Sequence, residues 1–134
     1  MSPEIELMEY LASITGIPLK PFVERDSKTG YILENNKPYA IMGDVRTNHQ
    51  QALYGDYVSG GFVISGFFPK TQGRNAENWG EFIRRKLLRQ TIETSEHYYT
   101  FKTVRKQVRK DITTQSILHR VTITVVFERS NKLN

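Results

Sequence analysis

The sequence predicts an α+β domain, in which an antiparallel sheet of four or slightly more strands has helices packed on one face, in the order α-β-β-α-β-β. Two segments space their apolar residues three and four positions apart, as amphipathic helices do. Four segments alternate apolar and polar residues, as strands with one buried face do. Strands in hairpin-like pairs beside helices are typical of an α+β sandwich. A chain of 134 residues suits a single domain over 1–134.

The first element is a helix at about 3–15. Ser2 is a suitable N-cap for this helix, and Pro3 suits its first position. The glutamates that follow lie near the positive end of the helix dipole, which they stabilise. Gly16, with a proline two residues later, predicts its end. The stripe expected to face the core consists of Ile5, Met8, Leu11 and Ala12, with Leu7 and Ile14 at its flanks.

The segment after this helix is rich in turn residues and predicts an extended crossing, with a short strand at about 31–33. Alternating apolar residues predict a strand at 39–46, and the polar residues 47–56 predict a loop. Another strand is expected at 57–68, where glycines permit a bulge or the close approach of another backbone. Its apolar face is Val58, Phe62, Ile64 and Phe68.

The second helix is predicted to begin at Asn75, which can cap it after a turn at 69–73. Its last turns carry Arg84, Arg85 and Arg89, cations that suit the negative end of the helix dipole. The buried stripe, at helical spacing, is Ala76, Trp79, Phe82, Ile83 and Leu87.

The last strand, at 117–128, has the clearest pattern in the chain, because apolar and polar residues alternate over a dozen positions. The segment before it is less regular. Its alternation holds through Phe101, but Val104 and Val108 lie four apart, which fits either a long strand or a short helix; the strand is favoured. A turn is expected at 111–116.

The charge of the chain is divided unevenly. Residues 1–83 hold 7 Lys/Arg and 10 Asp/Glu, a net of −3, whereas residues 84–134 hold 12 Lys/Arg and 4 Asp/Glu, a net of +8. This polarity favours a partner or a second copy of the chain, with an ordinary solvated basic face as the alternative. The chain has no cysteine and no long apolar run, which predicts folding in a reducing cytoplasm and no membrane span. Because its first residues are acidic and amphipathic, they are not expected to be a signal peptide.

Motifs for catalysis or cofactor binding are not found. The histidines, His49, His97 and His119, do not have metal-ligand spacing, and His119 is expected to be a satisfied core or interface residue. No nucleophile elbow or glycine-rich phosphate loop occurs, so we expect no enzyme and no cofactor. The remaining enzyme hypothesis places a carboxylate pair at Asp44 and Asp56, residue types that are also common in turns and at strand ends.

Five cations follow an aromatic stretch late in the chain. We call them the basic arm: Lys102, Arg105, Lys106, Arg109 and Lys110. Phosphate contacts beside stacking rings would make a nucleic-acid-binding module. Cations on an extended strand also guard it against aggregation and provide a docking surface for assembly.

The stretches "YVSGGFVISGFFPKTQGRNAENWGEF", "GRNAENWGEFIRRKLL" and "HRVTITVVFERSN" resemble the tail-terminator (tail-completion) proteins and the minor capsid proteins of long-tailed bacteriophages. The resemblance covers most of the chain in order and length, although residues 18–37 and the basic arm have no clear counterpart. It implies a non-enzymatic virion protein, assembled in the host cytoplasm. Such a protein forms a ring, typically a hexamer, that caps the tail tube and joins it to the head.

The resemblance also implies partners: further copies of the chain, the tail tube protein, the head connector proteins and DNA that passes through the ring. The residues expected to meet these partners are those of the basic arm, followed by Arg84, Arg85 and Arg89. The predicted loop 47–56 is a second interface candidate.

Overall fold

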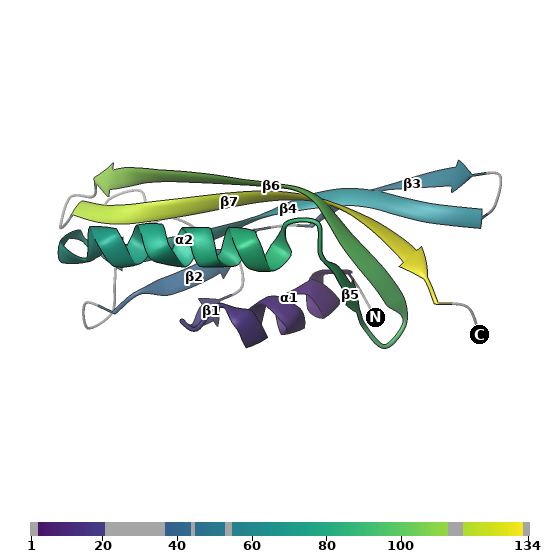
Figure 1. Ribbon diagram of the computed structural model, residues 1–134, viewed down its shortest axis with the longest axis horizontal. Coiled ribbons are helices and arrows are strands. Elements are labelled where there is room, and N and C mark those ends of the chain that lie inside the picture. The colour runs from purple at the N-terminus through teal and green to yellow at the C-terminus, as the bar shows by residue number, and fades with distance from the viewer. Residues whose placement is uncertain (1–2, 21–36, 44, 53–54, 113–116, 133–134) are drawn as a thin grey trace.

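The structure, a computed structural model, describes residues 3–20, 37–43, 45–52, 55–112 and 117–132. These residues form two helices against one face of a curled seven-stranded sheet (Figure 1). The helices are α1 (Pro3–Ile14) and α2 (Gly73–Leu87), and a short 3₁₀ helix (Lys70–Gln72) precedes α2. The strands are β1 (Leu19–Lys20), β2 (Tyr39–Met42), β3 (Arg46–Ala52), β4 (Gly55–Pro69), β5 (Thr91–Glu93), β6 (His97–Ile112) and β7 (Ile117–Asn131).

The strands lie in the order β1-β2-β4-β7-β6-β5, with β3 also paired to β4. β2 pairs with residues 64–67 of β4 and β3 with residues 55–61, so the two follow one another along the same edge of β4. Between the paired residues of β2 and those of β3, the N–H of Gly43 donates a hydrogen bond to the carbonyl oxygen of Val63 in β4 at 2.8 Å. The β1–β2 pair is parallel, and the other pairs are antiparallel.

The larger of two hydrophobic clusters lies between the helices and the sheet, and the smaller one consists of Tyr39, Ile41, Phe67 and Leu118. Trp79 of α2 donates from Nε1 to the carbonyl of Thr15, just after α1, at 2.8 Å, which ties the two helices together. The ring of Tyr10 in α1 stacks on Phe101 of β6. The core includes Leu7, Leu11, Phe62, Ile64, Phe68, Ala76, Ile83, Leu87, Tyr99, Val121, Ile123, Val125 and Phe127.

The predicted α+β class is confirmed, but the predicted four strands and their order are wrong. The polar segment 47–56 is not a loop, because most of it forms β3 and the start of β4. A strand at the edge of an antiparallel sheet can be polar because solvent reaches it. The polar composition of 47–56 therefore resembled that of a loop. β1 and β5 have only two and three residues, too few to show an alternation.

The buried face of α1 differs from the expected stripe. Leu7 and Leu11 are fully buried, whereas Ile5 is 51% exposed and Ala12 is exposed. Both sets of residues have helical spacing, so periodicity alone could not choose between them. The predicted end of the helix is confirmed, since Gly16 takes a φ of 69°.

Helix α2 starts earlier than predicted, since the 3₁₀ helix after β4 leads directly into it at Gly73, and Asn75 lies inside its first turn instead of capping it. Phe82 was expected in the core but is 46% exposed, with Lys86 Nζ 5.6 Å from the centre of its ring. The other members of the predicted stripe, Ala76, Trp79, Ile83 and Leu87, are buried.

The two long C-terminal strands are confirmed. The inward residues of β7 are fully buried from Val121 to Phe127, as period two predicts. His119 is satisfied as expected, because its Nε2 lies 2.9 Å from the carbonyl oxygen of Lys70. The predicted strand at 31–33, the cap at Ser2, Asp44 and residues 113–116 of the predicted turn lie outside the described residues, as do the side chains of His49 and Asp56.

Candidate interaction surface on the helix-free face of the sheet

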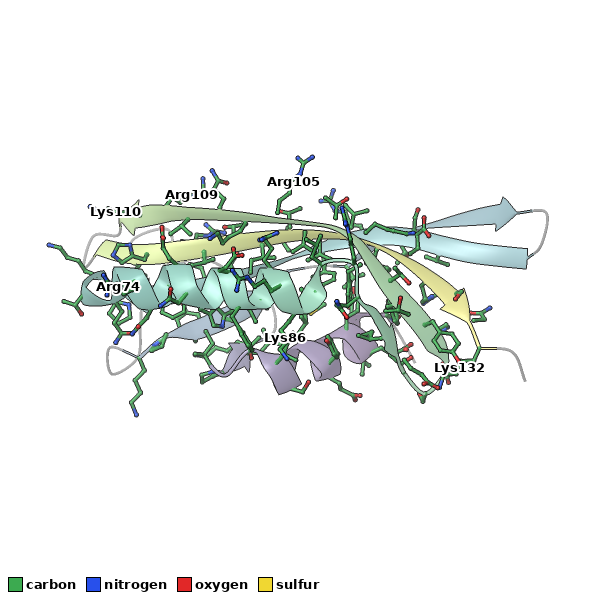
Figure 2. The ribbon with its side chains drawn as sticks, in the orientation of Figure 1. Arg74, Lys86, Arg105, Arg109, Lys110 and Lys132 are labelled. Atoms are coloured by element: carbon green, nitrogen blue, oxygen red, sulfur yellow. The ribbon has the colours of Figure 1, made fainter. Side chains whose placement is uncertain are left out.

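A β-bulge in β6 decides where the basic arm points. The register between β6 and β7 shifts between Phe101 and Thr103, so Lys102 is an extra residue. Before the bulge, Tyr99 and Phe101 face the helices; after it, Val104 does. Strand alternation then turns Lys106 toward the helices and directs Arg105 and Arg109 to the opposite face, where Figure 2 shows them projecting away from α2.

The helix-free face therefore carries polar residues from both long strands. We call this surface the arginine face, and it consists of Thr103, Arg105, Gln107 and Arg109 of β6 and Arg120, Thr122 and Thr124 of β7. Arg105 and Arg109 are exposed and form no ion pair with any described residue. Their charges are thus available to a partner.

Two cations meet directly across this face. Arg109 of β6 lies opposite Arg120 of β7 in the register. Cations directly opposite one another are unfavourable in a strand pair, so this register concentrates positive charge at one place on the face. Arg120 is held in place by Phe67, whose ring centre lies 5.4 Å from its guanidinium carbon. The arginine face thus carries three arginines, Arg105, Arg109 and Arg120.

A hollow adjoins the arginine face beside Thr124. Its floor lacks side chains at Gly43 and Gly61, and Val126, which is 45% exposed, forms part of its wall. Arg46 of β3 also lines it. The hollow thus has a largely apolar lining with one cation, Arg46, beside it.

Other predicted contact residues are occupied within the chain. Arg84 donates to both carboxylate oxygens of Glu81, at 3.1 Å and 2.8 Å, and Arg85 donates to the same carboxylate at 3.1 Å. Lys106 reaches it from β6, with an N–O distance of 3.5 Å. One carboxylate thus partly neutralises three of the predicted cations, and this cluster fastens α2 to β6.

Glu81 is expected to remain ionised far into the acid range. The hydrogen bond from Arg84 is the largest cause that lowers its pKa, from 4.5 to about 2, and Arg85 and Lys106 add to it. A carboxyl group whose pKa is lower in the folded state stabilises the fold above its unfolded pKa, and this contribution is lost as the pH falls through about 2. Side-chain carboxyl NMR should find the low midpoint, and Arg84→Gln should raise it. Lys102→Gln is the matched control, since Lys102 pairs with Glu128 at 3.6 Å; an ordinary midpoint in the unaltered protein would contradict the cluster.

The remaining predicted cations are scattered. Arg89 takes a φ of 60° just after α2, and its N–H donates to the carbonyl of Phe101, so it makes the turn into β5. Lys110 lies in register with His119 at the far end of β6 and is exposed. Of the eight predicted contact residues, the arginine face therefore holds only Arg105 and Arg109, and it adds Arg120, which the sequence did not single out.

A second polar cluster was not anticipated. Glu6 of α1 has a side chain that is 1% exposed, and its Oε1 lies 2.8 Å from Nδ1 of His97. Thr94 donates to the other oxygen of the same carboxylate. The cluster joins α1 to the turn between β5 and β6, across 91 residues of sequence.

Comparisons with known proteins add no assignment. A scan against the models of known protein families finds no match, and a search of curated proteins finds no relative. Among the described residues, no helix is both long and apolar enough to cross a membrane.

Proposed function

We propose that this chain is a bacteriophage virion structural protein, a non-enzymatic tail terminator that forms a ring at the head–tail junction, caps the tail tube and joins it to the head. The observation that supports it most is that the sheet, apart from the outer edges of the short strands β1 and β5, has strand edges on opposite sides without a strand partner among the described residues. One belongs to β3, which pairs only with β4, and the other to β6.

The β6 edge is long and basic. β5 covers β6 only at Tyr98–Thr100, and the backbone of Gln90 bonds with Phe101. Beyond Phe101, the described part of the chain offers no strand to this edge, which runs for roughly 35 Å. Such an edge is a template for pairing with another chain unless charges guard it, and cations occur along it.

Two edges on opposite sides of one sheet favour a head-to-tail contact between copies. In such a contact the β3 side of one subunit meets the β6 side of the next, and a constant rotation closes the series into a ring. The stretches that resemble phage tail terminators form most of β4, α2 and β7, and β4 and β7 are neighbours inside the sheet. In the ring, the arginine face would meet the acidic surface of the tail tube or head connector, or DNA in the channel.

Light scattering over a range of protein concentrations, with negative-stain images of the same samples, tests this proposal. We expect closed rings of about six subunits, alone or on isolated tail tubes. Reversing the charge at Arg105 and Arg109 should release subunits from the ring or the tube, since both lie beside the β6 edge. Arg74→Glu, on the exposed surface of α2, is the control and should leave assembly unchanged. A monomer that also fails to bind tail tubes would contradict the proposal.

Arg105 and Arg109 of the basic arm, exposed and without an ion pair to any described residue, favour a second candidate, a nucleic-acid-binding module. Its affinity for DNA should fall steeply with salt, and Arg105→Gln should reduce the slope by about one. Lys106→Gln is the matched control, because this neighbour faces the helices and contacts Glu81. Binding that is absent or insensitive to salt would exclude this candidate. The carboxylate hypothesis for Asp44 and Asp56 stays a prediction.

A further inference from the structure

The outer side of β6 has the features of a strand-binding site. Backbone pairing along this side ends at Phe101, whose N–H donates to the carbonyl of Gln90 and whose carbonyl accepts from the N–H of Arg89. From Lys102 to Lys110 the outer side has no strand partner among the described residues, and we call this stretch the open edge. Because every second residue of a strand directs its N–H and C=O to the same edge, a row of donors and acceptors is left there for another backbone.

Cations flank the open edge on both faces of the sheet. On the helix-free face, Arg105 and Arg109 are exposed and project away from α2 (Figure 2). On the other face, Lys106 lies beside α2, which adds Arg85, a side chain that is 77% exposed. Lys106 and Arg85 contact the same carboxylate, that of Glu81, so positive charge stays in excess on this face too.

We propose that the open edge binds an extended acidic segment of a partner protein by strand addition. Main-chain hydrogen bonds supply affinity in this mode of recognition, and alternate side chains supply specificity. Successive side chains of the added strand point to opposite faces of the sheet. Carboxylates on one face therefore meet Arg105 and Arg109, and those on the other meet Lys106 and Arg85. The unpaired backbone favours a peptide over nucleic acid, since only a peptide can continue the sheet.

A second copy of the chain suits the open edge less well than an acidic segment does. Its strand β3 carries the cation Arg46 and no carboxylate, so direct pairing of β3 with β6 would set cations beside cations. In the proposed ring, the acidic strand lies between the β6 side of one subunit and the β3 side of the next. This placement alone rests on the proposed function, because the open edge itself belongs to a single subunit.

Fluorescence anisotropy with a labelled peptide of alternating glutamate and threonine tests the site. The peptide has blocked ends and about eight residues, an ordinary strand length. The full chain is diluted until light scattering shows single subunits, so that self-assembly cannot cover the edge. We expect binding that is at least about tenfold weaker when every peptide nitrogen is methylated, because methylation keeps the carboxylates and removes the donors. Bound peptide should also slow hydrogen exchange of β6 amides beyond Phe101.

Two double variants test the cations. Replacing both Arg105 and Arg109 with glutamine should weaken peptide binding roughly threefold to tenfold, and these side chains are exposed, so the variant should still fold. Replacing Arg74 and Lys86 with glutamine is the control, because it removes the same charge from the exposed surface of α2. The control should bind the peptide like the unaltered protein.

Four results would overturn the proposal: no peptide binding, equal affinity for the methylated peptide, an equal loss of binding in the control variant, and tighter binding of a DNA strand of the same charge. The first would leave the cations only as guards of an edge against aggregation. The last would assign them to nucleic acid. Ring formation is measured on the concentrated chain without peptide, so loss of rings and loss of peptide binding are separate results.

Discussion

Replacing Trp79 with alanine is expected to cost about 3–5 kcal/mol of folding free energy. The indole fills the space between α2 and β4, where it lies so close to Gly66 that a Cβ at that glycine would be 2.5 Å from the ring. It also packs against Phe68, with 5.7 Å between ring centres. Its removal leaves a cavity and takes away the donor bonded to the carbonyl of Thr15. Chemical denaturation followed by circular dichroism would measure the loss.

Two variants show whether position explains the effect of Trp79→Ala. Phe82→Ala removes an aromatic ring from the same helix, but that ring is 46% exposed, so the cost should be much smaller. Trp79→Phe keeps much of the apolar volume but removes the donor and part of the ring, so it should fall between the two. An unfolding midpoint that hardly moves in Trp79→Ala would show that α2 presents a different face to the sheet.

Gly60→Ala is expected to destabilise the sheet by about 1–3 kcal/mol or more, because the added methyl group overpacks a closed interface. Its Cβ would lie 2.3 Å from the carbonyl oxygen of Arg46 and 2.7 Å from the ring of Phe127. The first of these atoms belongs to the backbone of β3 and cannot move without separating β3 from β4. The same denaturation experiment applies, and loss of the β3 edge should weaken assembly as well.

Gly43→Ala is the matched control for this substitution. It also introduces a methyl group beside a backbone carbonyl, that of Val63, but at 3.4 Å, an ordinary contact. Its stability should stay within about 0.5 kcal/mol of the unaltered protein. Equal stability of the Gly60 and Gly43 variants would mean that β3 does not approach β4 as closely as described.

How far the sequence predicts the fold depends on whether a strand has one buried face. β7 does, and its alternation predicted each inward residue from Val121 to Phe127. β6 has the same inner face, but the bulge at Lys102 shifts its phase by one residue, so the alternation breaks after Phe101. Val104 and Val108 looked helical because Lys106 takes the inward position between them. β3 lies at an edge, so its polar composition resembled that of a loop.

The candidate site was predicted only in part for related reasons. The basic arm was treated as one surface, although strand alternation alone would have separated Arg105 and Arg109 from Lys106. Arg120 became visible only with the register that sets it opposite Arg109. Contact between Glu6 and His97 depends on tertiary structure, and no local pattern indicates it. The one available signal was a carboxylate between two apolar residues of α1.

The long β6–β7 hairpin has a consequence for the order in which the chain folds. Its strands are separated by few residues, so pairing can start at Ile112 and Ile117 and proceed outward with little loss of chain entropy at each step. Docking of α1 brings together residues 91 positions apart in the sequence, which costs conformational entropy. This cost is offset only when the hairpin and α2 already provide an apolar surface for α1 to pack on. We therefore expect α1 to be the last element to dock and the first to detach, so hydrogen exchange in native conditions should be fastest there.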